Sequence, residues 1–444
     1  MASDLLTIAA SGTRAARSAL DVTAQNIANA STEGYIRRTA QMEEVAGASG
    51  FRTNDISLSG VRVAGVNRNA DAFRQAEVRR TNSDATRAST ELNGLKDIES
   101  AVEQADVYTA IVELESALKQ LGQDPVDPSL RAATLAAADA LAGKFNIAAN
   151  GLNAVTQGEQ FDASAEVDQA NVLAGELARI NQRLARAGAG SSDQSSLLDQ
   201  RDLMLEKLSG IANINTTFAA DGTVTVNLGG PTGPALVSGN NTSPLAMTTA
   251  ADGTISFDVG GTAVSVSGGS LSGHALALQE VANVRGKLDT LAASVADTVN
   301  AAQAAGVDLD GATGTPLFTG TTAATIALAT TDGRAIATAP AGAAAGSRDA
   351  SNLTALSSAL ETGGAADRMN SLLFDISSRV SGRQVTSEAL TTIASSARAT
   401  LLQQSGVDLD QEAANLIRFQ QAFQASGRAM QVATDIFDTL IGIG

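Results

Sequence analysis

The sequence contains no cysteine, no tryptophan and a single histidine, and aromatic residues make up only 3% of the chain. Without cysteine, disulfide bonds, thiolate catalysis and cysteine-based metal sites are all excluded. Aromatic rings supply much of the buried area in compact protein cores. The apolar fraction of 44% is nevertheless normal for a folded protein, and alanine dominates it. This composition favours slender, alanine-rich helices over one large globular core.

The sequence also lacks any run of lysine or arginine. It carries 30 basic and 47 acidic residues, a formal charge of −17, which argues against binding to nucleic acid. The N-terminus shows no basic segment followed by a continuous apolar stretch, so we expect no cleaved signal peptide. No stretch approaches the roughly 18 apolar residues of a membrane span, so we expect no membrane insertion. Composition alone predicts a cytoplasmic chain.

Motifs that would carry catalysis are missing or incomplete. His274 stands where a loop meets an expected helix, and a surface or near-cap position is the simplest interpretation. The pairs Gly143-Lys144 and Gly286-Lys287 lack the glycine spacing and the Ser or Thr of a phosphate-binding loop. Asp308 and Asp310 precede a glycine but lack the remaining ligands of a calcium loop. We therefore predict no catalytic residue, no metal, no cofactor and no enzyme activity.

Both ends of the chain show heptad-like apolar patterns, which are typical of helices that pack along other helices. The predicted contact residues are Leu6, Leu20 and Ile27 near the N-terminus, and Leu409, Leu416, Phe419, Phe423, Met430, Phe437 and Leu440 near the C-terminus. We expect the two stripes to pack on each other and neighbouring subunits to bury the remainder. An ordinary amphipathic helix docked on its own domain would give the same pattern.

The amino-acid composition of the middle of the chain changes twice. Residues 77–122, 129–157, 163–188 and 274–305 are expected to be helical, whereas residues 214–271 are rich in Gly, Thr, Ser and Val. Within them, ISFDVGGTAVSVSG predicts a hairpin around a Gly-Gly turn. Residues 306–350 look irregular with short strands. The predicted fold class is mainly α with inserted β, in which the terminal helices pair as a coiled-coil-like stem followed by a long-helix bundle.

We divide the chain accordingly into four parts. Residues 1–35 with 405–444 form a terminal assembly domain, and residues 36–213 with 272–305 and 351–404 form a helical middle domain. Residues 214–271 form an inserted β-rich outer domain. The irregular section 306–350 belongs to either the middle or the outer domain.

The segment NIANASTEGYIRR resembles a motif shared by bacterial flagellar rod, hook and hook-associated proteins. The matching positions are Asn26, Ile27, Ala28, Asn29, Gly34 and Tyr35. The C-terminal stretch is similar to the closing helix of the same axial protein family. Three further stretches, at 127–146, 196–214 and 300–319, resemble the hook-associated member of the family that joins hook to filament. Asn26, Asn29, Gly34 and Tyr35 are assigned to the family's turn.

The resemblance implies a structural subunit that is secreted through the flagellar export system and stays extracellular, at the hook–filament junction. It implies contacts with the hook protein, with a second hook-associated protein on the filament side, and with copies of itself in a ring layer. It also implies a cytoplasmic export chaperone on the C-terminal helix. Two alternatives stay open, namely a hook or other axial protein of the same system and a secreted coiled-coil adhesin. An enzyme in the inserted domain is a third.

Overall fold

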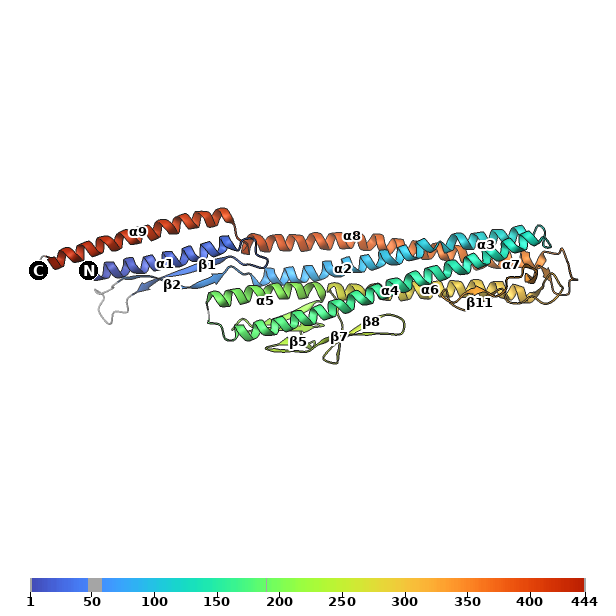
Figure 1. Cartoon of the computed structure of the whole chain (residues 1–444), viewed down its shortest axis with the longest axis horizontal. Helices are drawn as coiled ribbons and strands as arrows, with labels where there is room; N and C mark the ends of the chain where they lie inside the picture. The colour runs from blue at the N-terminus through green and yellow to red at the C-terminus, as the bar shows by residue number, and fades with distance from the viewer. Residues whose placement is uncertain (1, 47–57, 189, 443–444) are drawn as a thin grey trace.

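The protein is elongated, as a computed structural model of the chain shows (Figure 1). The structure describes residues 2–46, 58–188 and 190–442. A stem that contains both termini forms one end, a bundle of long helices forms the rest of the length, and a β-rich part lies along one side of the bundle (Figure 1). The expected fold class, mainly α with paired terminal helices and an inserted β part, is confirmed.

The stem combines helix α1 (Ala2–Ala28), helix α9 (Leu409–Gly442) and a two-stranded antiparallel hairpin of β1 (Arg38–Ala46) and β2 (Leu58–Arg68). The two helices lie side by side, and the hairpin packs against α1 (Figure 1). The Asp408 carboxylate caps α9 by accepting hydrogen bonds from the backbone N–H groups of Asp410 and Gln411. We assigned the hairpin to the middle domain, and because it packs on α1 we propose to count it with the stem.

Seven helices build the bundle: α2 (Ala72–Ala105), α3 (Val107–Leu121), α4 (Pro128–Leu184), α5 (Ser192–Ile211), α6 (Gly269–Ala305), α7 (Ser351–Gly363) and α8 (Ala365–Ser405). All of them except α5 contribute to one mainly aliphatic core, in which Ile98, Leu141, Phe145, Leu152 and Leu288 are fully buried. The buried residues Leu205, Leu208 and Ile211 of α5 pack with the β-rich part instead. Asp106, with a φ of 56°, separates α2 from α3. The scarcity of aromatic residues thus goes with a long, thin core.

Helix α4 corrects one prediction. The sequence suggested two helices, 129–157 and 163–188, but the structure has a single helix of 57 residues. Gly158 lies within this helix, and no atom within 4 Å would oppose a side chain at its position. The buried positions Thr156, Glu159, Ala163 and Val167 continue the inward face across the expected break.

The inserted part holds a four-stranded sheet, β3 (Ile214–Phe218), β4 (Val224–Leu228), β5 (Ala235–Ser238) and β6 (Asn241–Thr242), and a three-stranded sheet, β7 (Leu245–Thr249), β8 (Ile255–Val259) and β9 (Thr262–Val264). Both are antiparallel. The predicted hairpin is confirmed, because β8 and β9 pair across Gly260-Gly261. Asn171 and Asn181 of α4 hold the sheets by donating to the carbonyls of Leu245 and Val224.

The irregular section from 306 to 350 covers the end of the bundle that lies away from the stem. Its short elements are β10 (Gly306–Val307), β11 (Phe318–Thr319), β12 (Ala327–Leu328), a 3₁₀ turn η1 (Gly333–Ala335) and β13 (Ala339–Pro340). Arg131 of α4, only 1% exposed, donates from Nη1 to the carbonyls of Gly333 and Ile336. Phe318 joins the bundle core. These contacts connect the section to the helical bundle.

Candidate functional site at the terminal stem

The interface between α1 and α9 is built from small side chains. Ala9, Ala16 and Ala19 of α1 are buried, as is Ala433 of α9. At Gly12 the helices come so close that an added Cβ would lie 2.8 Å from the Ser426 Oγ. The helices therefore pair through alanine and glycine rather than through large apolar residues.

This finding corrects the expectation that the two stripes pack on each other. Their members Leu6, Ile27, Leu409, Phe423 and Phe437 are 42%, 36%, 54%, 39% and 48% exposed. Leu20, Leu416, Phe419 and Met430 are partly buried, and the side chain of Leu440 lies outside the described residues. Larger side chains between the helices would hold them apart, so the small-residue faces meet instead. As assembly contacts, these residues stay a prediction.

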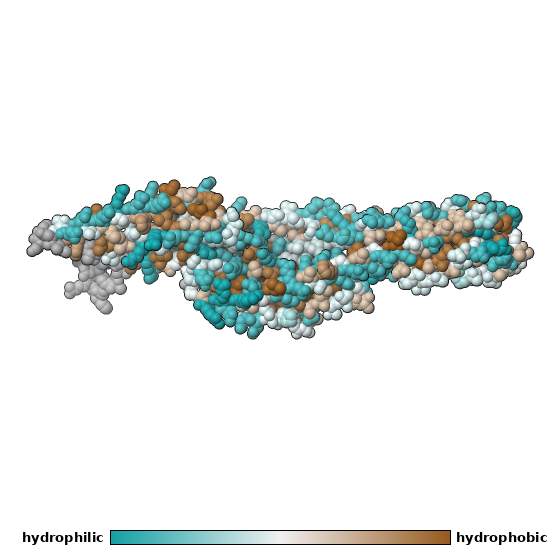
Figure 2. Space-filling view, viewed as in Figure 1, coloured by the Kyte–Doolittle hydropathy of each residue, from teal (hydrophilic) through white to brown (hydrophobic). Residues whose placement is uncertain are grey.

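A groove of about 590 Å³ follows the line where α1, α9 and β2 meet. Its walls are mostly apolar, with Leu5 and Ile8 from α1, Val61 from β2, and Val432 and Ile436 from α9. Figure 2 shows further apolar side chains gathered over α9 on the near side of the stem. Exposed apolar surface of this kind is typical of sites of protein–protein contact.

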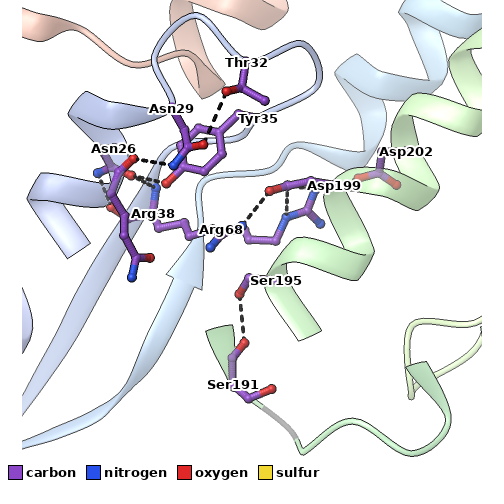
Figure 3. A network of polar contacts seen from close by, with 11 residues as sticks. Asn26, Asn29, Thr32, Tyr35, Arg38, Arg68, Ser191, Ser195, Asp199 and Asp202 are labelled. Carbon is purple, nitrogen blue, oxygen red and sulfur yellow. Dashed lines mark hydrogen bonds and ion pairs between the residues drawn. The ribbon is translucent and has the colours of Figure 1, made fainter. Parts of the chain in front are cut away.

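Where the stem meets the bundle, a network of buried polar groups joins the two (Figure 3). Asn26 near the end of α1 is only 1% exposed. Its Nδ2 donates to the Arg38 carbonyl at 2.8 Å and to Glu412 Oε2 at 3.1 Å. Its Oδ1 accepts from the Tyr35 hydroxyl at 2.9 Å and from the Arg38 N–H at 3.0 Å. Glu412, in the first turn of α9, also accepts from Arg37 Nε at 2.7 Å. Asn26 therefore connects α1, the following turn and α9.

The same network reaches helix α5 through paired charges. Asp199 accepts from Arg38 Nη2 at 2.9 Å and from Arg68 Nε at 2.8 Å, and Arg68 Nη2 also reaches Asp202 at 2.8 Å (Figure 3). Arg201 donates to the other oxygen of Asp202. These residues, with Asn26, Tyr35, Arg37 and Glu412, are called the junction network below.

The two aspartates of the junction network differ in pKa. Burial raises the pKa of Asp199, and Arg68 and Arg38 oppose this increase without cancelling it. Burial also raises the pKa of Asp202, but Arg201 and Arg68 outweigh it and hold that pKa below its usual value. Burial likewise raises the pKa of Tyr35. The network therefore contains charges whose burial is costly. Such a network is better suited to fixing the geometry between stem and bundle than to adding stability.

The structure brings the four residues of the turn motif together at the edge of this network. Gly34 has a φ of +77°, a conformation that favours glycine, and an added Cβ would lie 3.1 Å from the Leu203 Cβ of α5. Asn29 donates to the Gln25 carbonyl, and its Oδ1 accepts from the Thr32 hydroxyl (Figure 3). Tyr35 carries the guanidinium of Arg38 over its ring, 5.0 Å from the centroid.

Sequence reasoning missed the charged members of the network. Asp199 and Asp202 lie within the resembling stretch 196–214, but the sequence alone assigned no role to them or to Glu412. The signal was present in SLLDQRDL, where carboxylates and Arg201 stand on a helix with the apolar Leu197 and Leu205 around them. Charged residues at core positions indicate an internal ion-pair network. Which arginine pairs with which aspartate depends on the tertiary fold.

The histidine corrects another prediction, because His274 is 7% exposed rather than at the surface. Its Nδ1 lies 2.6 Å from Glu159 Oε2 and its Nε2 lies 3.7 Å from Glu166 Oε2.

The Asp308 carboxylate stabilises its own turn by accepting hydrogen bonds from the backbone N–H groups of Asp310 and Ala312. No group of three or more acidic or histidine side chains among the described residues could hold a metal ion. Within the same residues, no helix is long and apolar enough to span a membrane.

Comparison with known proteins identifies the family. The model of the flagellar hook-associated protein FlgK helical domain matches residues 92–318, just over half of the chain. The models of the flagella basal body rod protein and of the flagellar basal body rod FlgEFG protein C-terminal region match residues 6–35 and 399–443. The two terminal matches cover the stem helices, and the central match covers much of the bundle and the β-rich part.

Individual relatives agree with these matches. Flagellar hook-associated protein 1 of Escherichia coli is 27% identical over 335 residues, which are 71% of this chain and 60% of that protein. The Bacillus subtilis protein of that name is 25% identical, over 48% of this chain and 46% of its own length. The chain thus spans about 60% or less of these relatives.

One solved structure, the flagellar hook junction protein FlgK from Burkholderia pseudomallei, superposes with a TM-score of 0.65. The match covers 74% of this chain and 99% of that one, at 17% identity, so this likeness concerns the fold. The central family match decides membership, because it covers more than half of the sequence. The chain belongs to the family of the flagellar hook-associated protein FlgK.

Proposed function

We propose that this protein is a non-catalytic structural subunit that assembles at the tip of the flagellar hook and joins the hook to the filament. Membership of the FlgK family supports a role in the flagellum. The observation that carries the proposal is the stem, whose two helices pair through small residues and leave large apolar side chains uncovered. Further subunits packed around the stem would cover them.

The exposed residues lie on both stem helices. Neighbouring subunits on more than one side of the stem could therefore contact them. Leu5 and Leu6 of α1 are 50% and 42% exposed, and Val432, Ile436 and Phe437 of α9 are 57%, 41% and 48% exposed. Each such side chain gains roughly 1–2 kcal/mol when a neighbour removes it from water. A ring layer of identical subunits, in which stems pack against stems, provides this burial at every position.

The same surface supports the partners that we propose. The hook protein lies on one side of the layer and a second hook-associated protein on the filament side. Before export, a chaperone covers α9, because its exposed Phe423 and Phe437 suit the helix-in-groove mode of recognition. The protein acts outside the cell, after export by the flagellar secretion system. We propose no catalysis, and His274 is engaged in contacts with two carboxylates.

Electron microscopy of cells that lack this gene tests the proposal, with the medium assayed for filament protein. We expect complete hooks without filaments and filament subunits lost to the medium. Missing hooks would indicate instead a hook or other axial protein. Normal, motile flagella would refute the proposal and favour the adhesin alternative.

Complementation of the deletion strain separates the stem surface from the protein as a whole. A variant with Phe423→Ser and Phe437→Ser is expected to be exported but to restore few filaments. The matched control carries Gln424→Ser and Gln431→Ser, two exposed positions of the same helix. It loses at least as much helix propensity as the phenylalanine variant, and it loses no apolar surface. Full activity of the phenylalanine variant would show that the exposed stripe is not an assembly contact.

A further inference from the structure

A polar pocket lies where the β-rich part is attached to the bundle. The chain leaves α5 and enters β3 through Asn213, and it returns to α6 through Ser267 and Gly268. Asn213 joins the two connections: its N–H donates to the Gly268 carbonyl, its Nδ2 donates to Ser267 Oγ at 2.8 Å, and its Oδ1 accepts from the Ser267 N–H. The pocket beside them measures about 400 Å³. Helix α2 forms its other wall.

Two buried polar side chains of α2 line this pocket without adequate partners. The hydroxyl of Ser83, a residue only 3% exposed, has no hydrogen-bond partner among the described residues. Arg79 is 7% exposed, and no carboxylate within the described part of the chain forms an ion pair with it. Its one hydrogen bond there is a long one, 3.5 Å from Nη2 to Thr216 Oγ1. A buried guanidinium without a counter-charge is costly unless something else compensates it.

The third wall is the start of helix α6. This helix has 37 residues and begins at Gly269, and no side chain caps its first turn. The first N–H groups of a helix lack partners within it, and the helix dipole places partial positive charge there. Gly268 lets the start of the helix approach Ser83 closely, since an added Cβ would lie 2.5 Å from Ser83 Oγ. Gly268, the residue before α6, thus lines the pocket together with Arg79 and Ser83 of α2.

The charges around the pocket favour an anion. Arg80 and Asp84 also line it, and they pair with each other at 3.3 Å. Arg79 feels the charges of Asp202 and Glu206 and lies 5.9 Å from the centre of the Phe218 ring, but no carboxylate of the described residues forms a direct ion pair with it. A guanidinium, a hydroxyl and a helix N-terminus are the groups with which proteins bind oxyanions.

We propose that this pocket, formed by Arg79, Ser83 and the start of α6, binds a small oxyanion of the size of phosphate or a carboxylate group. The bound anion accepts hydrogen bonds from the guanidinium and the Ser83 hydroxyl and lies at the positive end of α6. Because the pocket touches α2 and both connections of the insert, binding fixes the β-rich part relative to the bundle. The anion comes either from solution or from a carboxylate of another protein segment.

Calorimetric titration of the full chain with inorganic phosphate and, separately, with acetate tests the proposal at constant ionic strength, with chloride as the reference anion. We expect saturable binding of at least one of the two. Stronger phosphate binding indicates a free anion, and stronger acetate binding indicates a carboxylate source. Arg79→Gln is expected to weaken binding at least about tenfold, because it removes a charge-assisted hydrogen bond. Ser83→Ala is expected to weaken it less.

The matched control is Arg179→Gln, which removes an exposed arginine from α4 and leaves the pocket intact. Amide chemical shifts of glycine-labelled protein locate the anion, and we expect the largest changes at Gly268 and Gly269. Circular dichroism shows whether Arg79→Gln stays folded. If that variant fails to fold, the Ser83→Ala titration and the glycine shifts still decide. Absence of saturable binding by the native chain, or equal binding by Arg79→Gln and Arg179→Gln, would overturn the proposal.

Discussion

Replacing His274 with glutamine tests how the start of α6 is held on α4. The ring is buried between two carboxylates of that helix, with Glu159 at 2.6 Å and Glu166 at 3.7 Å. Ser270 also donates to Glu166, at 2.5 Å. Burial lowers the pKa of His274, but the hydrogen bonds and charges of Glu159 and Glu166 outweigh it and raise the pKa from 6.5 to about 9. Glutamine keeps a hydrogen-bond donor at this position and loses the charge.

The sign of the pH effect follows from the direction of this change. The folded protein holds the proton more tightly than the unfolded chain, so protonation stabilises the fold. This contribution is complete below pH 6.5 and is lost as the pH rises through about 9. The difference between the two pKa values corresponds to about 3 kcal/mol of unfolding free energy. His274→Gln should therefore cost about 3 kcal/mol at pH 6 relative to its cost at pH 10.

The assay has two parts, and both use the fact that the chain has one histidine. The imidazole signal in a proton NMR titration reports His274 alone, and we expect it to titrate near pH 9. Urea unfolding of the native protein and of His274→Gln is then compared between pH 6 and pH 10. Subtracting the two curves at each pH removes the titration of all other groups. A ring that titrates at or below pH 6.5, or a pH-independent difference, would refute the reasoning.

Three further predictions concern the stem and the bundle. Asn26→Ala removes the bonds to Arg38, Tyr35 and Glu412 and should cost about 2–3 kcal/mol, measured as faster hydrogen exchange in α1 and α9; unchanged exchange would contradict it. Gly12→Leu should overpack the interface, separate α1 from α9 and cost at least about 1–3 kcal/mol of stability. The control Gly427→Leu should leave the two helices together, because no atom lies within 4 Å of a Cβ added there. Limited proteolysis should therefore cut the stem of the Gly12 variant faster than the stem of the control. Gly158→Ala should stabilise the bundle by about 0.5–1 kcal/mol in urea unfolding, and a loss of stability would show an unrecognised role for that glycine.

The arrangement of long helices around an inserted β part was predictable, because the spacing of apolar residues and the local composition differ between the two kinds of structure. Alternation around Gly260-Gly261 specified a hairpin, and the apolar heptads at both ends specified helices. The sequence predicted two helices, 129–157 and 163–188, where α4 is one; Gly158 stands between them, and its propensity cost of about 1 kcal/mol yields to tertiary packing. Local preference decides such a boundary only when the inward face also ends there.

The contact face of the stem was mispredicted for a related reason. An apolar stripe indicates burial but does not say by which molecule. Ala16 and Ala19 meet α9 within the chain, while Leu6 and Phe437 stay exposed. Sequence patterns rank large residues above small ones, yet helices approach most closely where side chains are small. The proposed subunit would pair its own ends and then pack against others, and a small-residue interface with large exposed residues around it fits that proposal.

The junction network explains how such a subunit keeps one orientation of stem and bundle. Asp199 is held by Arg38 at the start of β1 and by Arg68 at the end of β2, so two strands of the stem meet on one carboxylate of α5. Burial raises the pKa of Asp199 despite both arginines, so its charge adds little to stability. An apolar contact in its place would bury as much surface but would tolerate sliding, whereas paired charges with fixed hydrogen-bond geometry do not. Asn26 extends the same constraint to α9 through Glu412. In the proposed layer, where stems pack among identical neighbours, this constraint would matter, because an error in the angle between stem and bundle would recur in every subunit.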